Sequence, residues 1–541
     1  MTERALTPLE PYNLYASDPV LHRAVEREGA ASASASLHDF GERVGSAEVF
    51  EWGFDANRNS PELITHDRFG ERIDEVRYHP SYHRLMELSV GEGLHASHYD
   101  GEPGDGSYVA RTARMHMMSQ VEVGHGCPLS MTGAVLPALR EQADLAQVWE
   151  PRVRTRSYDP RLVEPASKSG VLLGMGLTEK QGGSDVRANI STAAAVNGGG
   201  PGAEYRLTGH KWFTSAPMCD AFLVLAQAPG GISCFLVPRV LPDDSRNSLR
   251  FMRLKDKLGN RSNASSELEY TDAAGWLIGE EGRGINVIIK MVNGTRVDVT
   301  NWAAALMRQA TSQAAHYLSQ REAFGDLLID KPLMQNVLAD LELETEVATL
   351  MTMRLAGAFE RAPLDEHEAA FMRLSSAVAK YWLTKRSTPV VREALECVGG
   401  NGYVEESILP RLYREAPLNA IWEGAGNVIA LDVLRALDRA PVAGEAFLAE
   451  LGNARGADRS FDRELDLLGS ELAADGTRSE AGARRLVERL ATTWGAALCL
   501  QHEPTIADAY IRSRLDGDWG SEFGTLDPQL DLAELAARAT P

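Results

Sequence analysis

The spacing of apolar residues changes twice along this chain of 541 residues. Up to about residue 168 it mostly fits helices, as in the segment 109–124. Between about 169 and 284, short runs rich in β-branched and aromatic residues alternate with Gly, Pro, Asn and Asp. Helical spacing then returns. This order predicts an α+β multidomain protein, because the chain is too long for one compact core.

We predict four domains from these changes. They are an N-terminal helical domain (1–168), a middle antiparallel β domain (169–284), a C-terminal α-helical bundle of four helices (285–438) and an additional helical domain (445–541). Residues 438–445, rich in Pro, Ala and Gly, predict a linker before the last domain. In the bundle region one apolar stripe is expected, made by Leu333, Val337, Leu341, Ala348, Met351, Leu355 and Phe359.

Composition argues against several classes of protein. The five cysteines are scattered without CxxC spacing, so we expect neither a disulfide framework nor a metal site. The amino terminus lacks a leader pattern and no run of 18 apolar residues occurs, which favours a cytoplasmic protein without a membrane segment. The net charge of −21 disfavours polyanions such as DNA unless a local basic patch binds them. Residues 441–541 hold 10 Arg, no Lys and 18 acidic residues, a net charge of −8.

Two glycine-containing segments carry the chemical signal. In 176–188 (GLTEKQGGSDVRA) a predicted strand enters a Gly-Gly-Ser turn, where Thr178 and Ser184 add hydroxyls. This is either a polar ligand loop or a structural turn. In 396–415 a predicted helix ends at Gly399 and Gly400, which fit either a helix C-cap or a close approach to a pyrophosphate.

Together, the two segments resemble the two signature patterns of the acyl-CoA dehydrogenase family. The first pattern is met by Thr178, Glu179, Gly182, Gly183, Ser184, Asp185 and Ala188. The second is met by Glu396, Gly399, Gly400, Gly402, Tyr403, Glu406, Arg411 and Glu415. Further matches are KWFTS (211–215), KLGNR (257–261) and REAFG (321–325), so the resemblance covers roughly 111–437. Over nearly its whole length the sequence is similar to the AidB-type, alkylation-response branch of that family.

The resemblance implies an acyl-CoA dehydrogenase-like fold, noncovalent FAD and a homo-oligomer, expected to be a tetramer with a flavin site shared between subunits. It implies oxidation of an acyl-CoA-like small molecule, with Glu423 as the catalytic base that takes the α-proton while the β-hydride passes to flavin N5. Taken alone, a Glu before a helix is also typical of a helix cap.

The remaining site residues are also carried over from the family. Arg321, Gly399 and Gly400 would reach the FAD pyrophosphate of a neighbouring subunit, although Arg321 alone also fits a surface salt bridge. Trp212 and Phe213 would pack on the flavin ring and Thr214 would donate to N5, although Trp212 alone also fits core packing. The other expected cofactor contacts are Met175, Leu177, Thr178, Gly183, Ser184, Ser215, Trp422, Gly424 and Asn427. Ser184 and Arg296 would contact substrate.

Two positions depart from the family pattern, and two rival functions stay open. Pro332 stands where the family often has a glutamine, and Glu396 replaces a common glutamine. One rival is an AidB-type alkylation-response protein that binds DNA and protects it, with low dehydrogenase activity. The other is a structural flavoprotein scaffold. Arg484, Arg485 and Arg489 cluster on a predicted helix, but Glu488 lies among them and a solvated face is expected.

Overall fold

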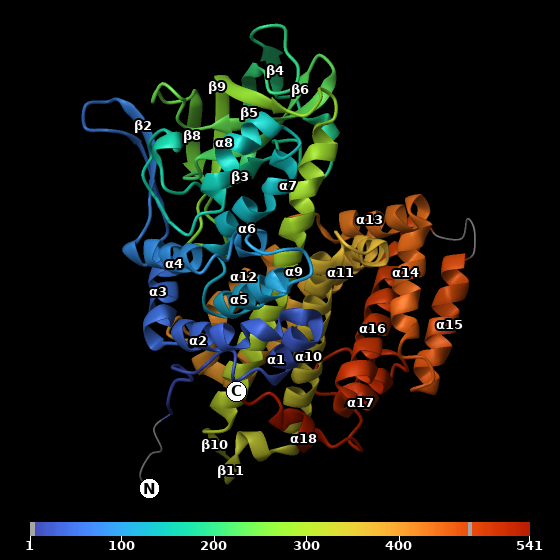
Figure 1. Cartoon of the computed structure of the whole chain (residues 1–541). Coiled ribbons are helices and arrows are strands. Elements are labelled where there is room, and N and C mark those ends of the chain that lie inside the picture. Colours follow the sequence, from blue (N-terminus) through green and yellow to red (C-terminus); the bar gives the residue numbers. More distant parts are fainter. Residues whose placement is uncertain (1–5, 474–478) are drawn as a thin grey trace. The chain divides into compact units, whose positions relative to one another are not determined.

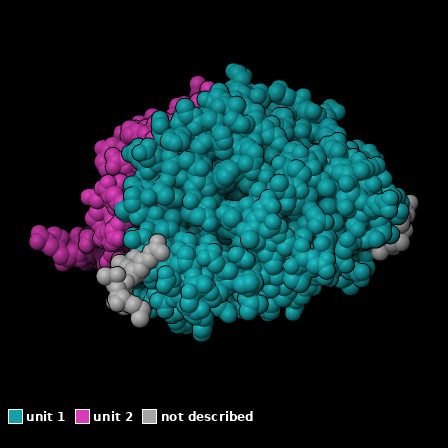
Figure 2. Space-filling model, turned by 90° about the horizontal axis from the view of Figure 1, so that it is seen from below, with its two compact units in different colours: residues 1–47, 102–121, 297–541 teal, residues 48–101, 122–296 magenta. Residues whose placement is uncertain are grey.

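The structure is a computed structural model that describes residues 6–473 and 479–541. It divides into two compact units, coloured in Figure 2. Unit 1 comprises residues 6–47, 102–121, 297–473 and 479–541, and unit 2 comprises 48–101 and 122–296. Each is described by itself below. The division into four domains stays a prediction.

In unit 2, a hairpin interrupts the region predicted to be helical. Strands β1 and β2 pair antiparallel and join α3 to α4 (Figure 1). The turn between them is fixed by the Asp67 carboxylate, which accepts hydrogen bonds from the backbone N–H groups of Phe69 and Glu71 at 2.8 and 2.9 Å. The helices and the hairpin of this unit are α3 (Ala47–Arg58), β1 (Glu62–His66), β2 (Arg72–Arg77), α4 (Pro80–Gly91), α6 (Gly126–Ala134), α7 (Leu136–Leu139) and α8 (Ala143–Val153).

The predicted β domain is confirmed as one sheet in unit 2, ordered β3-β5-β4-β6-β7-β9-β8. Because β5 also pairs with β9, the pairings run from β5 through β4, β6, β7 and β9 back to β5, so the sheet closes into a barrel. Most pairs are antiparallel, but β3 and β4 each lie parallel to β6. The strands are β3 (Leu173–Gly176), β4 (Thr192–Ala195), β5 (Glu204–Ser215), β6 (Ala221–Ala228), β7 (Gly231–Pro238), β8 (Leu249–Leu254) and β9 (Ser265–Ile278).

Unit 1 is built from long helices, in which α10 and α11 lie side by side. Along α10, Leu341, Ala348, Met351 and Leu355 are fully buried as the stripe predicted, whereas Leu333 in its first turn is 83% exposed. The elements are α1 (Pro19–Val25), α2 (Ser34–Val44), α5 (Ser107–Val121), α9 (Gly284–Leu318, from Val297 in this unit), β10 (Glu322–Ala323), β11 (Asp326–Leu327), α10 (Pro332–Arg361), α11 (Glu366–Val398), α12 (Leu409–Asn419), α13 (Gly426–Arg439), α14 (Pro441–Gly452), α15 (Arg459–Ala473), α16 (Ala483–His502), α17 (Pro504–Arg514) and α18 (Leu532–Ala537).

The linker predicted at 438–445 is wrong. Helix α13 continues to Arg439 and α14 starts at Pro441, so Ala440 alone separates them. Proline is tolerated in the first turn of a helix, because the N–H it lacks would have no intrahelical partner there. The alanines that follow favour the helix.

The carboxy-terminal helices share a core with the bundle. Phe371 of α11, Phe447 of α14 and Trp494 of α16 are fully buried, with ring centroids 5.5–5.8 Å apart. Buried charges also join the two parts: Arg354 of α10 binds Glu450 of α14 at 2.6 Å, and Arg514 of α17 binds Asp340 of α10 at 2.5 Å. Residues 441–473 and 479–541 are therefore integrated into unit 1.

Within the described part of the chain, every helix is too short or too polar to cross a membrane.

Candidate functional site

The first signature segment is a loop that follows β3 in unit 2. Gly176, the last residue of β3, pairs with Thr214 of β5, and the backbone N–H of Trp212 donates to the Thr178 carbonyl at 2.7 Å. The side-chain amide of Asn189 donates to the Leu177 carbonyl at 3.0 Å. These bonds hold the loop against the strand that carries the KWFTS sequence.

A buried ion pair fixes the loop to β5. The carboxylate of Glu179 and the ammonium of Lys211 lie 2.7 Å apart, and neither side chain has exposed surface. Glu179 also accepts the backbone N–H groups of Ile190 and Ser191. Burial alone would raise the pKa of Glu179, but the Lys211 hydrogen bond and these backbone donors lower it to about 2. The family match included both residues, but their pairing was not predicted from the sequence.

The turn leaves empty space beside its first glycine, although the backbone N–H and carbonyl of Gly182 are hydrogen-bonded to Glu179. Gly182 has φ 134°, which disfavours other residues, and a Cβ there would meet no described atom within 4 Å. A Cβ on Gly183 would lie 2.3 Å from the Thr178 hydroxyl, so only glycine permits this close approach. Ser184 is exposed, while Met175 and Leu177 are half-buried. The arrangement fits a ligand loop as well as a turn.

The KWFTS strand places its residues on different sides. Phe213 is exposed and Trp212 half-buried, with the Lys255 ammonium 3.4 Å from the Trp212 ring centroid. Thr214 is fully buried, and its hydroxyl has no hydrogen-bond partner among the described residues. Ser215 is half-buried, with its hydroxyl 3.3 Å from that of Ser265.

In unit 1, the second signature segment forms the turn that ends α11. Gly399 has φ 66°, and both Gly399 and Gly400 are exposed with no described atom within 4 Å of an added Cβ. Arg411, for which the sequence predicted no role, donates from its guanidinium to the Val121 carbonyl at 2.6 Å and so connects α12 to α5.

Arg321 follows α9, directly before the β10–β11 hairpin, and is exposed. Within residues 6–473 and 479–541 it belongs to no ion pair, so the surface salt bridge considered from the sequence is not observed. An exposed arginine is available to a phosphate.

Glu423 lies in the turn between α12 and α13. It is half-buried, with φ 57°, and Gly424 follows at φ 109°. Because the N-cap of α13 is Ala425, Glu423 does not occupy the capping position. A positive φ is uncommon for glutamate and is typical of functional turns held by their surroundings. Here the surroundings include Lys380, buried on α11, which donates to the Gly424 carbonyl.

The other predicted site residues differ in how far they are exposed. Trp422 packs against Trp302 of α9 with centroids 5.4 Å apart, and its indole N–H has no partner among the described residues. Asn427, in the first turn of α13, is exposed. Arg296 lies on α9 in unit 2 and is buried, so any substrate contact would need a path to it.

Unit 2 also holds a serine–histidine–glutamate series outside these segments. The Ser89 hydroxyl lies 2.9 Å from His125 Nε2, and His125 Nδ1 lies 2.7 Å from the Glu122 carboxylate. This resembles the order of a nucleophilic triad. All three are at most 4% exposed, and Glu122 also accepts from Asn57 and Ser262. The series is a buried hydrogen-bond network that fixes the turn before α6.

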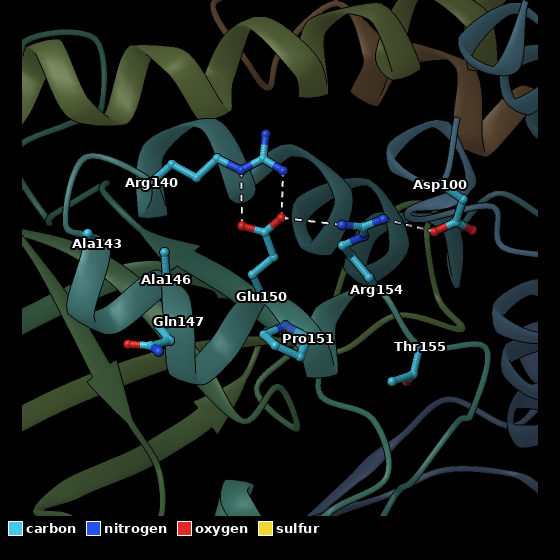
Figure 3. A pocket seen from close by; sticks show the side chains of 9 residues that line it. All are labelled: Asp100, Arg140, Ala143, Ala146, Gln147, Glu150, Pro151, Arg154 and Thr155. Carbon is cyan, nitrogen blue, oxygen red and sulfur yellow. Dashed lines mark hydrogen bonds and ion pairs between the residues drawn. The ribbon is translucent and has the colours of Figure 1, made fainter. Parts of the chain in front are cut away.

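A hollow of about 690 Å³ lies along α8 in unit 2. Figure 3 shows the side chains that line it. Its charges alternate: Arg140 binds Glu150 through two hydrogen bonds, Glu150 also faces Arg154, and Arg154 faces Asp100. Two arginines and two carboxylates cancel, which gives the hollow no preference for an anion. No predicted site residue lines it.

The residues present fit FAD in two respects. Glycines at 182, 399 and 400 leave space beside the backbone into which a ligand can fit, and Thr214 holds a buried hydroxyl that lacks a described partner. An unsatisfied buried hydroxyl costs about 1–3 kcal/mol, which a bound group can offset. Among the described residues there is no cluster of His, Cys, Asp and Glu that could hold a metal.

Family models match most of the chain. Residues 5–160 match the adaptive response protein AidB N-terminal domain, 174–273 the acyl-CoA dehydrogenase middle domain, and 282–437 the acyl-CoA dehydrogenase C-terminal domain. These ranges agree with the extent of the resemblance inferred from the sequence.

Individual relatives agree. The protein AidB of Escherichia coli (strain K12) is 44% identical over 94% of this chain and 93% of its own length. Acyl-CoA dehydrogenase family member 11 of Caenorhabditis elegans is 31% identical over 96% and 88%. The crystal structure of C. elegans ACDH-11 in complex with C11-CoA is 28% identical, with a TM-score of 0.84 over 100% of this chain and 92% of that one. We conclude that the chain belongs to the acyl-CoA dehydrogenase family of FAD-dependent oxidoreductases, in its AidB-type branch.

Proposed function

We propose that Glu423 is the base of an acyl-CoA dehydrogenase reaction in this protein. The observation that carries the proposal is the turn itself. Glu423 has a positive φ, and the buried Lys380 holds its turn by donating to the carbonyl of the next residue, Gly424. Glu423 comes before α13 but is not its N-cap residue. When bound, FAD supplies the hydride acceptor. The carboxylate of Glu423 would take the α-proton of the thioester while the β-hydrogen leaves as hydride to the bound flavin, so that a double bond conjugated with the thioester carbonyl forms between the two carbons.

The loop residues are proposed to hold the cofactor. In unit 2 these are Met175, Leu177, Thr178, Gly183 and Ser184, then Trp212, Phe213, Thr214 and Ser215. In unit 1 they are Arg321, Gly399, Gly400, Trp422, Gly424 and Asn427. Support comes from the open glycine backbone, the exposed arginine and the unpartnered Thr214 hydroxyl. For substrate, Ser184 is exposed and therefore better placed than the buried Arg296.

The substrate class is proposed to be an acyl-CoA with a chain near eleven carbons, because the structurally similar worm protein is in complex with C11-CoA. The test is an anaerobic titration of the yellow protein with saturated acyl-CoAs of graded length, followed at the oxidised flavin band. Bleaching should peak near that length. Glu423→Gln should keep FAD and lose bleaching, because an amide cannot take the proton.

Two results would count against this reaction. Full bleaching in Glu423→Gln would remove this residue from the role of base. An unchanged flavin band in the parent with every chain length would remove dehydrogenation and favour the scaffold or DNA-protecting alternatives. Glu406→Gln is a matched control, because it makes the same change at an exposed glutamate outside the turn before α13.

We further propose a homotetramer that acts in the cytoplasm. Phe324, at the tip of the β10–β11 hairpin, is 96% exposed and Leu333 is 83% exposed, both within twelve residues of Arg321. Large exposed apolar side chains gathered near one segment favour a covered surface. Light scattering of the full chain tests this, and a monomer at micromolar concentration would contradict it.

A further inference from the structure

A buried lysine contacts the turn that carries Glu423. Lys380, near the middle of α11, is 1% exposed, and its ammonium donates a hydrogen bond to the carbonyl of Gly424. All three residues belong to unit 1. Because burying a charge without polar partners is strongly unfavourable, this bond helps to keep the ammonium inside the protein.

Packing alone does not account for a lysine at position 380. Its neighbours on α11, Ala379 and Tyr381, are buried as well. A methionine has a similar length, fills irregular buried space and carries no charge that must lose its water. What a lysine adds is an ammonium that reaches from α11 to the turn between α12 and α13.

The backbone of this turn is fixed on both sides of Glu423. Glu423 and Gly424 have φ of 57° and 109°, both outside the range that most residues adopt. On the α12 side, the backbone N–H of Trp422 donates to the Leu418 carbonyl at 3.2 Å. On the α13 side, Lys380 holds the carbonyl of Gly424. Glu423 is the residue between these two fixed points.

We propose that Lys380 is a positioning residue for Glu423. By fixing the Gly424 carbonyl it holds the adjacent backbone of Glu423, and so sets the direction in which the carboxylate points. This inference rests on the proposed function, in which that carboxylate takes the α-proton of an acyl-CoA. Proton transfer needs close approach and alignment, and a misplacement of about 1 Å can slow a reaction about 100-fold. Lys380 acts through the turn and takes no proton itself.

The test is stopped-flow reduction of the flavin in the full-length, FAD-loaded protein, by the saturated acyl-CoA that bleaches the parent most. Lys380→Met keeps the length of the side chain but loses the donor. We expect its limiting rate constant to fall about 10- to 100-fold. The acyl-CoA concentration that gives half of this rate should change by less than about threefold, because the lost contact acts on the proton transfer and not on binding.

A purely structural role of Lys380 predicts a different result. A destabilised variant has fewer loaded sites, which lowers the amplitude of bleaching but leaves the rate constant of the remaining sites unchanged. Lys380→Arg keeps a charged donor at this position and should recover part of the lost rate constant. Rescue by arginine therefore supports the hydrogen bond, and a loss of amplitude alone overturns the inference.

Arg373→Met is the matched control. Arg373 also lies on α11 and also contacts α13, through Asp432 at 3.0 Å, but Asp432 lies within the helix and not in the Glu423 turn. Because this pair is 40% exposed on the arginine side, its loss should leave the rate constant within about twofold. A fall as large as that of Lys380→Met would show that any contact between α11 and α13 has the same effect, which overturns the inference.

Hydrogen exchange of the backbone segment 418–428, measured without acyl-CoA, gives a readout that does not depend on activity. Exchange should be faster in Lys380→Met than in Arg373→Met, and equal exchange would count against the inference. Should Lys380→Met fail to fold, Lys380→Gln carries the same test with a shorter polar side chain. Failure of the proposed function looks different: the parent would not bleach with any acyl-CoA, or Glu423→Gln would bleach as the parent does.

Discussion

At the residue scale, the residues of unit 2 that match the family patterns have two different roles. Glu179 and Lys211 have no exposed surface, so they cannot touch a ligand and act by fixing the loop. Gly182 and Ser184, on the same loop, are exposed, and Gly182 is bonded to Glu179 through its backbone alone. A buried pair that loses one partner leaves an uncompensated charge, which is far more costly than losing a surface pair.

We therefore expect Lys211→Met to lower the free energy of unfolding by about 3–5 kcal/mol, because it leaves the Glu179 carboxylate buried and unpaired. Glu204→Gln on the same strand removes a half-exposed pair with Arg206 and should cost about 0–1 kcal/mol. Urea unfolding at neutral pH compares them. Equal losses of unfolding free energy in the two variants would show that the buried Glu179–Lys211 pair stabilises the fold no more than a surface pair does.

The same pair predicts a pH dependence. Because the pKa of Glu179 is lowered from 4.5 to about 2, its charge stabilises the fold fully above pH 4.5, and this contribution disappears as the pH falls toward 2. The Glu179→Gln variant has no carboxylate at this position, so its stability lacks this dependence on pH. The difference in melting temperature between the parent and Glu179→Gln should therefore shrink over that interval. A constant difference would contradict the lowered pKa.

Sequence patterns identified the segments of the candidate site but not the direction of each side chain. The glycines at 182, 399 and 400 could be predicted as open turns, because glycine is the residue that such backbone favours. That Arg296 is buried and Phe213 exposed depends on helix and barrel packing between distant segments, which no local pattern contains. The approach of Arg484 to Gly426 spans 58 residues and is set by how α16 packs on α13.

At the element scale, the carboxy-terminal block shows where composition misleads. Pro, Ala and Gly at 438–445 predicted a linker, but Pro441 starts α14 and the helix places Phe447 in the bundle core. Phe447 of α14 and Trp494 of α16 therefore pack in one core with Phe371 of α11. They complete a core that α11 could not cover alone.

Phe447→Ala should accordingly destabilise the whole of unit 1, by about 3–5 kcal/mol, since it empties a fully buried aromatic site between Phe371 and Trp494. Val442→Ala, on the same helix but 58% exposed, should change stability by less than about 0.5 kcal/mol. Thermal unfolding followed by helical circular dichroism and by flavin release should give one shared transition for Phe447→Ala. An early, separate loss of the last helices would restore the linker model.

At the scale of the whole molecule, charge decides between the enzyme and the DNA-protecting alternative. The block at 441–541 is acidic overall, and its arginines are largely bound to acids: Arg489 to Glu464 and Glu471, Arg463 to Asp516, Arg512 to Asp527, and Arg538 to Glu346 and Glu503. Binding to duplex DNA gains free energy from released counterions only where cations are available to replace them. Paired arginines supply little of this gain.

We therefore expect weak DNA binding at about 150 mM salt, with a dissociation constant no tighter than roughly 10⁻⁵ M, inside the non-specific range. Fluorescence anisotropy with a labelled duplex measures it, and the slope of log affinity against log salt counts the phosphates engaged. Replacing Glu464 and Glu471 by Gln releases Arg489 and adds two units of positive charge, which should tighten binding and steepen the slope. If the parent already binds tightly with a steep slope and the double variant changes nothing, the DNA contacts lie on another surface and protection of DNA becomes the better account of this flavoprotein.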